Sequence, residues 1–119
     1  MLSETDAKGE ILFVNESFCE ISQYEWRELV GKSHSIIRHK DMPEKLFMHM
    51  WKEIEQGKVF RGILKNKAKD ESHYWVRTTI MPVYGNLGKI TKYLGGTYPI
   101  RDERVAEELY REQSKILQF

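Results

Sequence analysis

The sequence predicts an α+β domain built on a five-stranded, largely antiparallel sheet, with short helices and one longer helix on one face. Two patterns support this fold class. A turn cluster at Asp6–Gly9 divides residues 1–15 into two strand-like halves, which is typical of a hairpin. Further along, a meander is indicated by three strand-like runs separated only by turns, at about 59–67, 73–83 and 89–99. The helices that cover the sheet are predicted between the second and third strands.

The best-defined helix is predicted over about residues 43–56. Asp41 is expected to cap its N-terminus, and Gly57 follows its last turn, where glycine commonly ends a helix. Its large apolar residues recur at helical spacing along one stripe: Leu46, Phe47, Met50, Trp51 and Ile54. We therefore expect one face of this helix to be buried.

The chain has 119 residues, which suits one domain. Residues 1–100 have the strand and helix pattern of that domain, and residues 101–119 are predicted to begin a C-terminal linking helix. Four residues of this helix repeat at intervals of four, three and four, namely Val105, Leu109, Glu112 and Ile116. The spacing suits a helix that continues into an output domain, so we interpret the chain as a piece of a longer protein.

The charge balance argues against binding to nucleic acid or to an anionic membrane. Lys and Arg (19) nearly cancel Asp and Glu (18), so no long-range field attracts a polyanion. No apolar run approaches the roughly 18 residues that span a bilayer, and the signal-peptide pattern is missing. The single cysteine, Cys19, fits a reducing compartment, and no Cys/His cluster has metal-ligand spacing. We expect a cytoplasmic protein, or the cytoplasmic part of a membrane-anchored receptor.

Asn66 is the most informative single residue. Alternation along the strand 59–67 places Asn66 on the apolar side together with Phe60, Gly62 and Leu64. A buried primary amide without partners costs roughly 1–3 kcal/mol. Something polar is therefore expected inside the domain. The imide edge of a flavin ring would serve, and so would a buried water or a backbone group.

Other candidate positions have two interpretations each. Asn15 either caps the helix that follows it or belongs to a ligand site. Phe47 and Trp51 are either plain core residues or the planar wall of a site for an aromatic ligand. The segment 36–43 brings Arg, His, Lys and Asp to a helix N-terminus, where it forms either a solvated loop or a site that stabilises a phosphate.

Three motifs resemble, in order and spacing, the flavin-binding PAS domain of bacterial aerotaxis transducers: IRHKDMP, LFMHMW and GILKNKAKDESHYWVR. The preceding VNESF and YEWRELVGK match the more general PAS pattern of an Asn at a strand end and a short helix ending at Gly. The resemblance covers about residues 3–100. It departs at Lys40, where proline is usual, and at YPIRDE, which replaces an ending of the Asp-Ile-Thr type.

The resemblance implies a sensory PAS domain that binds FAD non-covalently, with the isoalloxazine ring between the long helix and the sheet. It also implies sensing of redox state or oxygen, and signalling to a chemotaxis-type output. The positions that match cofactor-binding or pocket-lining residues of that family are Asn15, Arg38, His39, Asp41, Phe47, Trp51 and Asn66. No nucleophile with a base, and no paired acid and base, is evident in the sequence, so we expect no enzymatic activity.

Partners are expected at the outer face of the sheet and along the C-terminal helix. Alternation along the strand 73–83 places Trp75 on the outer face, which suggests cover by an N-terminal cap, a second protomer or a downstream domain. We therefore expect dimerisation, and contact with a downstream signalling domain or with a partner chemoreceptor or kinase.

The main alternative is a PAS protein–protein interaction module without a redox cofactor, or with another small ligand such as haem. Covalent flavin photochemistry is not expected, because Cys19 lies too early in the chain to stand beside the ring. Haem is a weaker alternative, because His49 points away from the buried stripe of the long helix. His34 and His73 are predicted at the surface.

Overall fold

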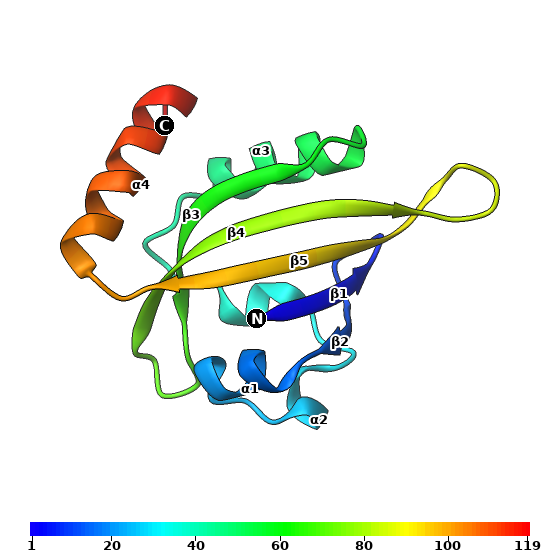
Figure 1. The fold of residues 1–119 in the computed structure, drawn as a ribbon, viewed down its shortest axis with the longest axis horizontal. Coiled ribbons are helices and arrows are strands. Elements are labelled where there is room, and N and C mark those ends of the chain that lie inside the picture. Colours follow the sequence, from blue (N-terminus) through cyan, green and yellow to red (C-terminus); the bar gives the residue numbers. More distant parts are fainter.

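The computed structural model describes the whole chain, residues 1–119 (Figure 1). Its strands are β1 (Leu2–Asp6), β2 (Ile11–Val14), β3 (Phe60–Lys67), β4 (His73–Tyr84) and β5 (Ile90–Ile100). Its helices are α1 (Glu16–Ser22), α2 (Trp26–Leu29), the 3-10 helix η1 (His34–Ile37), α3 (Glu44–Glu55) and α4 (Glu103–Leu117). None of these helices combines the length and the apolar character needed to cross a membrane.

The five strands form one antiparallel sheet in the order β2-β1-β5-β4-β3, which confirms the predicted α+β class. β1 pairs with β5, so the N-terminal hairpin and the last strand of the meander lie side by side (Figure 1). The Asp6 carboxylate fixes the hairpin turn by accepting hydrogen bonds from the backbone N–H groups of Lys8 (2.9 Å) and Glu10 (3.0 Å). The turn and the strands therefore agree with the sequence pattern.

Helix α3 begins at Glu44, so the prediction that Asp41 caps it is wrong. Pro43 occupies the N-cap position with extended backbone (φ −69°, ψ 144°), and proline disfavours helical geometry in the residue before it. Asp41 consequently lies outside the helix, and its carboxylate forms an ion pair with Lys65 at 3.1 Å. At the other end Gly57 has φ +83°, the left-handed conformation in which glycine ends a helix.

The apolar stripe of α3 faces the sheet, as predicted. Trp51 is half-buried, and the other residues of the stripe are buried: Leu46, Phe47, Met50 and Ile54. They pack with Leu64 of β3 and Val76 of β4 in the main core. A smaller cluster, which includes Ile11, Phe18 and Leu29, supports the hairpin and the short helices. The main core therefore lies between α3 and the meander.

Helix α4 turns back and packs on the outer face of the sheet, next to β3 (Figure 1). It covers Trp75, which is 4% exposed and lies 5.5 Å from the ring of Tyr110 between centroids. The prediction that Trp75 is covered is thus confirmed. The cover is a helix of the chain itself, which was not among the three covers that the sequence suggested.

Only Leu109 of the predicted seam of α4 packs on the sheet. Val105 and Ile116 are 44% and 79% exposed, and Glu112 is exposed as well. The packed side is offset by about a quarter turn and consists of Ala106, Leu109, Tyr110, Gln113 and Leu117. Continuation of α4 into an output domain therefore stays a prediction.

Gln113 joins α4 to the free edge of β3. Its side-chain oxygen accepts a hydrogen bond from the backbone N–H of Ile63 (2.7 Å), and its amide nitrogen donates one to the Ile63 carbonyl (3.0 Å). These are the two groups that a neighbouring strand would pair with at this position. The side chain of Gln113 therefore blocks the strand edge, which an uncovered sheet would leave open to association.

Replacing Gln113 with alanine removes both hydrogen bonds to Ile63. We expect the free energy of unfolding to fall by about 1–2 kcal/mol, because each such bond contributes roughly 0.5–1.5 kcal/mol net. Urea denaturation measures this change. Glu108→Ala, at an exposed position of the same helix, is the matched control and is expected to change stability by less than about 0.5 kcal/mol. Equal stability of the two variants would show that Gln113 does not hold α4.

Candidate functional site

A cavity lies between α3 and the inner face of the sheet. Its volume is about 80 Å³, whereas a single water molecule needs only roughly 10–15 Å³ by the same measure. Most of its lining side chains are hydrophobic, and the aromatic residues among them are Phe18, Phe47, Trp51, Tyr74 and Tyr93. A concave, largely apolar site with a few polar groups is the usual form of a small-molecule site.

Asn66 supplies an amide to this cavity, as the strand pattern predicted. It is 7% exposed, and it faces Tyr74 across the β3–β4 ladder. Burial raises the pKa of the Tyr74 hydroxyl to about 12, and the Asn66 side chain opposes that rise. Tyr74 is therefore a neutral hydrogen-bonding group at physiological pH, and the pair offers both donors and acceptors at one end of the cavity.

Two buried threonines face the same space. Thr78 is 7% exposed and Thr5 is 8% exposed, and both line the cavity. Neither threonine hydroxyl forms a hydrogen bond with another residue of the protein. Buried polar groups normally have partners, so the cavity wall presents unused hydrogen-bonding capacity.

Flat side chains from α3 form one wall of the cavity. Phe47 and Trp51 lie one helical turn apart, and the Arg38 guanidinium carbon lies 3.9 Å from the Phe47 ring centroid. Trp51 meets Tyr93 edge to face, with 5.6 Å between centroids. Gly9 has φ +92°, and a Cβ there would lie 3.0 Å from the Trp51 ring, so any larger residue would displace this wall.

The cavity adjoins a shallow groove on the exposed side of α3. Arg38, Phe47 and Trp51 line both spaces. The groove alone is lined by Glu44, Met48, Lys52, Glu55 and Gln56. Burial lowers the pKa of the Arg38 guanidinium, and the charge of Glu44 raises it. A ligand with a flat apolar part and a charged part could thus occupy the cavity and the groove together.

Four of the seven residues named from the sequence line the cavity: Arg38, Phe47, Trp51 and Asn66. Asn15 lies outside it, where its side-chain oxygen accepts hydrogen bonds from the backbone N–H groups of Leu2 (3.0 Å) and Phe18 (3.1 Å). Asn15 caps α1, which was one of its two interpretations. His39 and Asp41 also lie outside the cavity.

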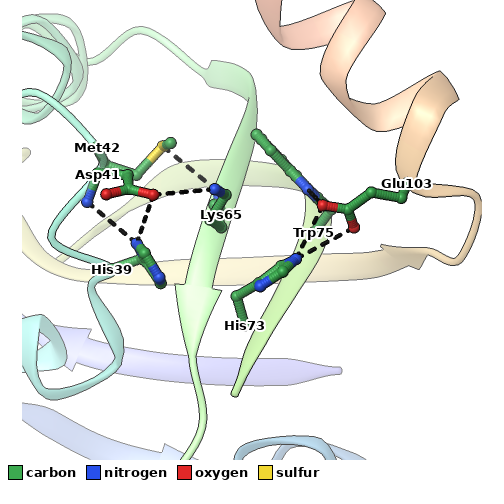
Figure 2. A network of polar contacts seen from close by, with 7 residues as sticks. All are labelled: His39, Asp41, Met42, Lys65, His73, Trp75 and Glu103. Carbon is green, nitrogen blue, oxygen red and sulfur yellow. Dashed lines mark hydrogen bonds and ion pairs between the residues drawn. The ribbon is translucent and has the colours of Figure 1, made fainter. Parts of the chain in front are cut away.

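Figure 2 shows that His39 and Asp41 belong to a polar network on the outer side of β3 and β4. His39 Nδ1 accepts a hydrogen bond from the backbone N–H of Asp41 (3.0 Å), and the Lys65 ammonium donates to Asp41 (3.1 Å). Nearby, the Glu103 carboxylate accepts from the Trp75 indole N–H (3.0 Å). The structure thus divides the seven residues among the cavity, the α1 cap and this network.

The sequence interpretation missed His34, which was predicted at the surface and in fact lines the cavity. Its Nε2 lies 3.4 Å from the hydroxyl of Ser3, a buried residue of β1. The pKa of the His34 imidazole is lowered to about 4, mainly by burial; a backbone hydrogen bond opposes the shift, and the charge of Arg38 adds to it. The four-residue η1 has no periodicity that would reveal its inner side. The alternation of β1 puts the polar residues Ser3 and Thr5 on one face. This pattern could have indicated that a polar partner such as His34 lies inside the domain.

The fold and this cavity define the chain as a member of the PAS fold family, whose family model matches residues 11–96. The chain is 37% identical over 113 residues to the aerotaxis receptor of Escherichia coli (strain K12), an alignment that covers 93% of this chain and 22% of the receptor. It is 26% identical over 117 residues to the nitrogen fixation regulatory protein of Klebsiella pneumoniae, with 98% of this chain and 24% of that protein covered. The chain spans less than a quarter of the length of these relatives.

Solved structures share the fold. The dark structure of the blue-light photoreceptor Aureochrome1 LOV superposes with a TM-score of 0.86, covering 99% of this chain and 86% of that chain at 18% identity. A light-oxygen-voltage domain studied with a flavin analogue superposes with a TM-score of 0.85, covering 96% of this chain and 86% of that chain at 20% identity. At these identities the likeness shows the fold alone.

We expect stability to decrease as pH falls from about 6.5 to about 4, because the unfolded His34 binds a proton in this range and the folded one does not. Carboxyl groups whose pKa is lowered in the folded protein lose their contribution below this window. Urea denaturation at a series of pH values measures the effect, and His34→Gln should reduce it to the part that His39 contributes, whose pKa burial also lowers. An imidazole that titrates near pH 6.5 by NMR would contradict the expectation.

Proposed function

We propose that this chain is a sensory PAS domain that binds FAD non-covalently and signals redox state or oxygen to a chemotaxis-type output. The observation that carries the proposal is the buried amide of Asn66, which faces a cavity walled by planar side chains. The similarity to a protein named aerotaxis receptor supports the oxygen signal and the output. The IRHKDMP motif, whose arginine lines the cavity, supports the ligand class.

The residues present fit a flavin. The pyrimidine edge of such a ring alternates hydrogen-bond donors and acceptors, and a primary amide can satisfy one of each. Asn66 would hold that edge, with the Tyr74 hydroxyl across the β3–β4 ladder from it. Phe47 and Trp51 would bury the faces of the ring, and Arg38 would balance the charge of a phosphate-bearing tail directed toward the groove.

A bound flavin supplies reversible two-electron redox chemistry. The chain's own residues would orient the ligand, exclude water and place one positive charge beside it. Tyr74 and His34 are uncharged at neutral pH, so Arg38 is the single charged side chain on the cavity wall. A site of this kind favours any change that adds negative charge to the ligand, because one cation lies nearby without an anion in the cavity.

The proposed signal leaves through the sheet. A change in the hydrogen bonding of Asn66 would act on β3, whose outer side contacts α4. The output would be a signalling domain or partner, such as a chemoreceptor or kinase, that contacts the outer face and the C-terminal helix. We also propose self-association, since Leu2, Met81 and Tyr98 are 46%, 40% and 73% exposed on the outer face.

A PAS interaction module without a redox cofactor is the second candidate, and the same exposed apolar residues favour it. A haem domain would need an axial ligand inside the cavity. His49 is not on the cavity wall; it lies 3.6 Å from the Glu53 carboxylate and contacts the Phe60 ring. His34 is the one histidine on the cavity wall, so a haem would have to be held there.

The decisive measurement is the visible spectrum of the protein purified from cells, with the acid-released cofactor identified by mass. We expect flavin bands and the mass of FAD. Asn66→Ala should weaken FAD binding roughly 5- to 150-fold, because the lost hydrogen bonds cost about 1–3 kcal/mol. Trp51→Ala should also weaken binding, through the loss of stacking area.

Lys67→Ala is the matched control, because Lys67 lies next to Asn66 along β3 and points to the outer face. It should keep the flavin of the unaltered protein. A colourless protein that free FAD does not reconstitute would rule out the redox proposal and leave the interaction module. A Soret band would indicate haem.

A further inference from the structure

Two segments that meet on the outer face are connected by six side chains: His39, Asp41, Lys65, His73, Trp75 and Glu103 (Figure 2). We call this set the outer network. It joins the 38–42 segment, which follows η1, to the first residue of α4. The network lies outside the cavity, and the proposed function assigns it no role.

The 38–42 segment is tied to both sides of β3. Arg38 forms a backbone bridge with Asn66, and its side chain lies on the cavity wall. Three residues later, Asp41 pairs with Lys65, whose side chain is only 16% exposed. The backbone N–H of Lys65 also donates to the sulfur of Met42 (3.4 Å). Asn66 and Lys65 are neighbours in one strand, so a shift of the β3 backbone moves both.

The second half of the network holds α4. Glu103 accepts a hydrogen bond from the Trp75 indole N–H (3.0 Å), and both of its oxygens contact His73 Nε2 (2.9 and 3.2 Å). The Trp75 hydrogen bond is the largest cause that keeps the pKa of Glu103 below its usual value; burial opposes it, and His73 and Lys65 also lower the pKa. Glu103 is the first residue of α4, directly after the Asp102 cap. Its contacts therefore fix where the helix begins.

Two contacts connect the halves. The Lys65 ammonium lies 5.1 Å from the centroid of the Trp75 ring, within reach of a cation–π attraction. The rings of His39 and His73 meet edge to face at 6.1 Å between centroids. A continuous set of contacts therefore runs from Arg38 at the cavity to Glu103 at α4.

We propose that the outer network couples ligand binding in the cavity to the docking of α4, with Asp41 and Lys65 acting as positioning residues for Arg38 rather than as ligand contacts. The coupling to a flavin rests on the proposed function, whereas the coupling between the 38–42 segment and α4 does not. Coupling between two sites is reciprocal. Ligand binding must therefore stabilise docked α4 by the same factor by which docking of α4 tightens ligand binding.

The first test needs no ligand and measures amide hydrogen exchange across α4 in the full chain. We expect Asp41→Asn, Lys65→Met and Glu103→Gln each to speed exchange in α4 roughly fivefold or more, because each breaks a charge-assisted contact of the network. The matched controls are Lys67→Met, on the same face of β3, and Glu107→Gln, on the exposed side of α4. Faster exchange confined to residues 38–44 in Asp41→Asn would overturn the proposal.

The second test titrates FAD against the same variants. Lys65→Met and Glu103→Gln should weaken FAD binding by about the factor by which FAD slows exchange in α4. Exchanging the two charges, in the double variant Asp41→Lys with Lys65→Asp, should restore much of the affinity lost in either single variant. Unchanged affinity in Lys65→Met together with loss in Asp41→Asn would assign Asp41 to the ligand and overturn the proposal.

The two proposals fail in different ways. If the unaltered chain binds no FAD, the proposed function is wrong, and the exchange measurement on the ligand-free protein still decides whether the 38–42 segment and α4 are coupled. If FAD binds and α4 exchanges equally fast with and without it, the function stands and the proposed coupling is wrong.

Discussion

The alternating side-chain directions along β3 determine what lies on each face of the domain. Leu64 and Asn66 point into the core and the cavity, whereas Ile63 and Lys65 point toward α4 and the outer network. In the ladder with β4, Asn66 faces Tyr74 and Lys65 faces Trp75. A slip of one residue would exchange all of these partners at once, so the register of one strand pair specifies both the ligand site and the docking of the helix.

Docking of α4 depends on contacts of different kinds at its two ends. Near its start, Glu103 is bound by Trp75 and His73, and ten residues later Gln113 binds the backbone of Ile63. At about 1.5 Å per residue these two points are about 15 Å apart along the helix axis. Two polar contacts at that separation fix both the position and the rotation of the helix. The exposed position of Val105 and Ile116 follows from that rotation.

Much of this arrangement follows from local patterns in the sequence. Strand alternation places Asn66 inside and Trp75 outside, and a wide apolar stripe marks the buried face of α3, because these signals depend on neighbours within one element. The pattern could not show that α4 folds back over Trp75, since its packed face is offset from its most regular seam. It could not place His39 and Asp41 outside the cavity, because the path of an irregular segment depends on contacts such as the pair with Lys65.

The polar groups of the cavity are spread across four strands of the sheet. Asn66 belongs to β3, Tyr74 and Thr78 to β4, Thr97 to β5, and Ser3, which lies near His34, to β1. Two strands separate β1 from β3. Along β4, the residue level with Ser3 is Ile80, six positions from Tyr74, which is level with Asn66.

Apolar side chains, including those of Leu64, Ile80 and Ile54, lie among these polar groups. A compact polar ligand would reach the polar groups at one end of the cavity and leave those at the other end without a partner. An elongated, flat ligand with polar atoms near both ends would reach both ends. Arg38 lies at the boundary with the groove, so the charged part of such a ligand would be stabilised there. The distribution of polar groups therefore selects for the shape of the ligand as well as for its chemistry.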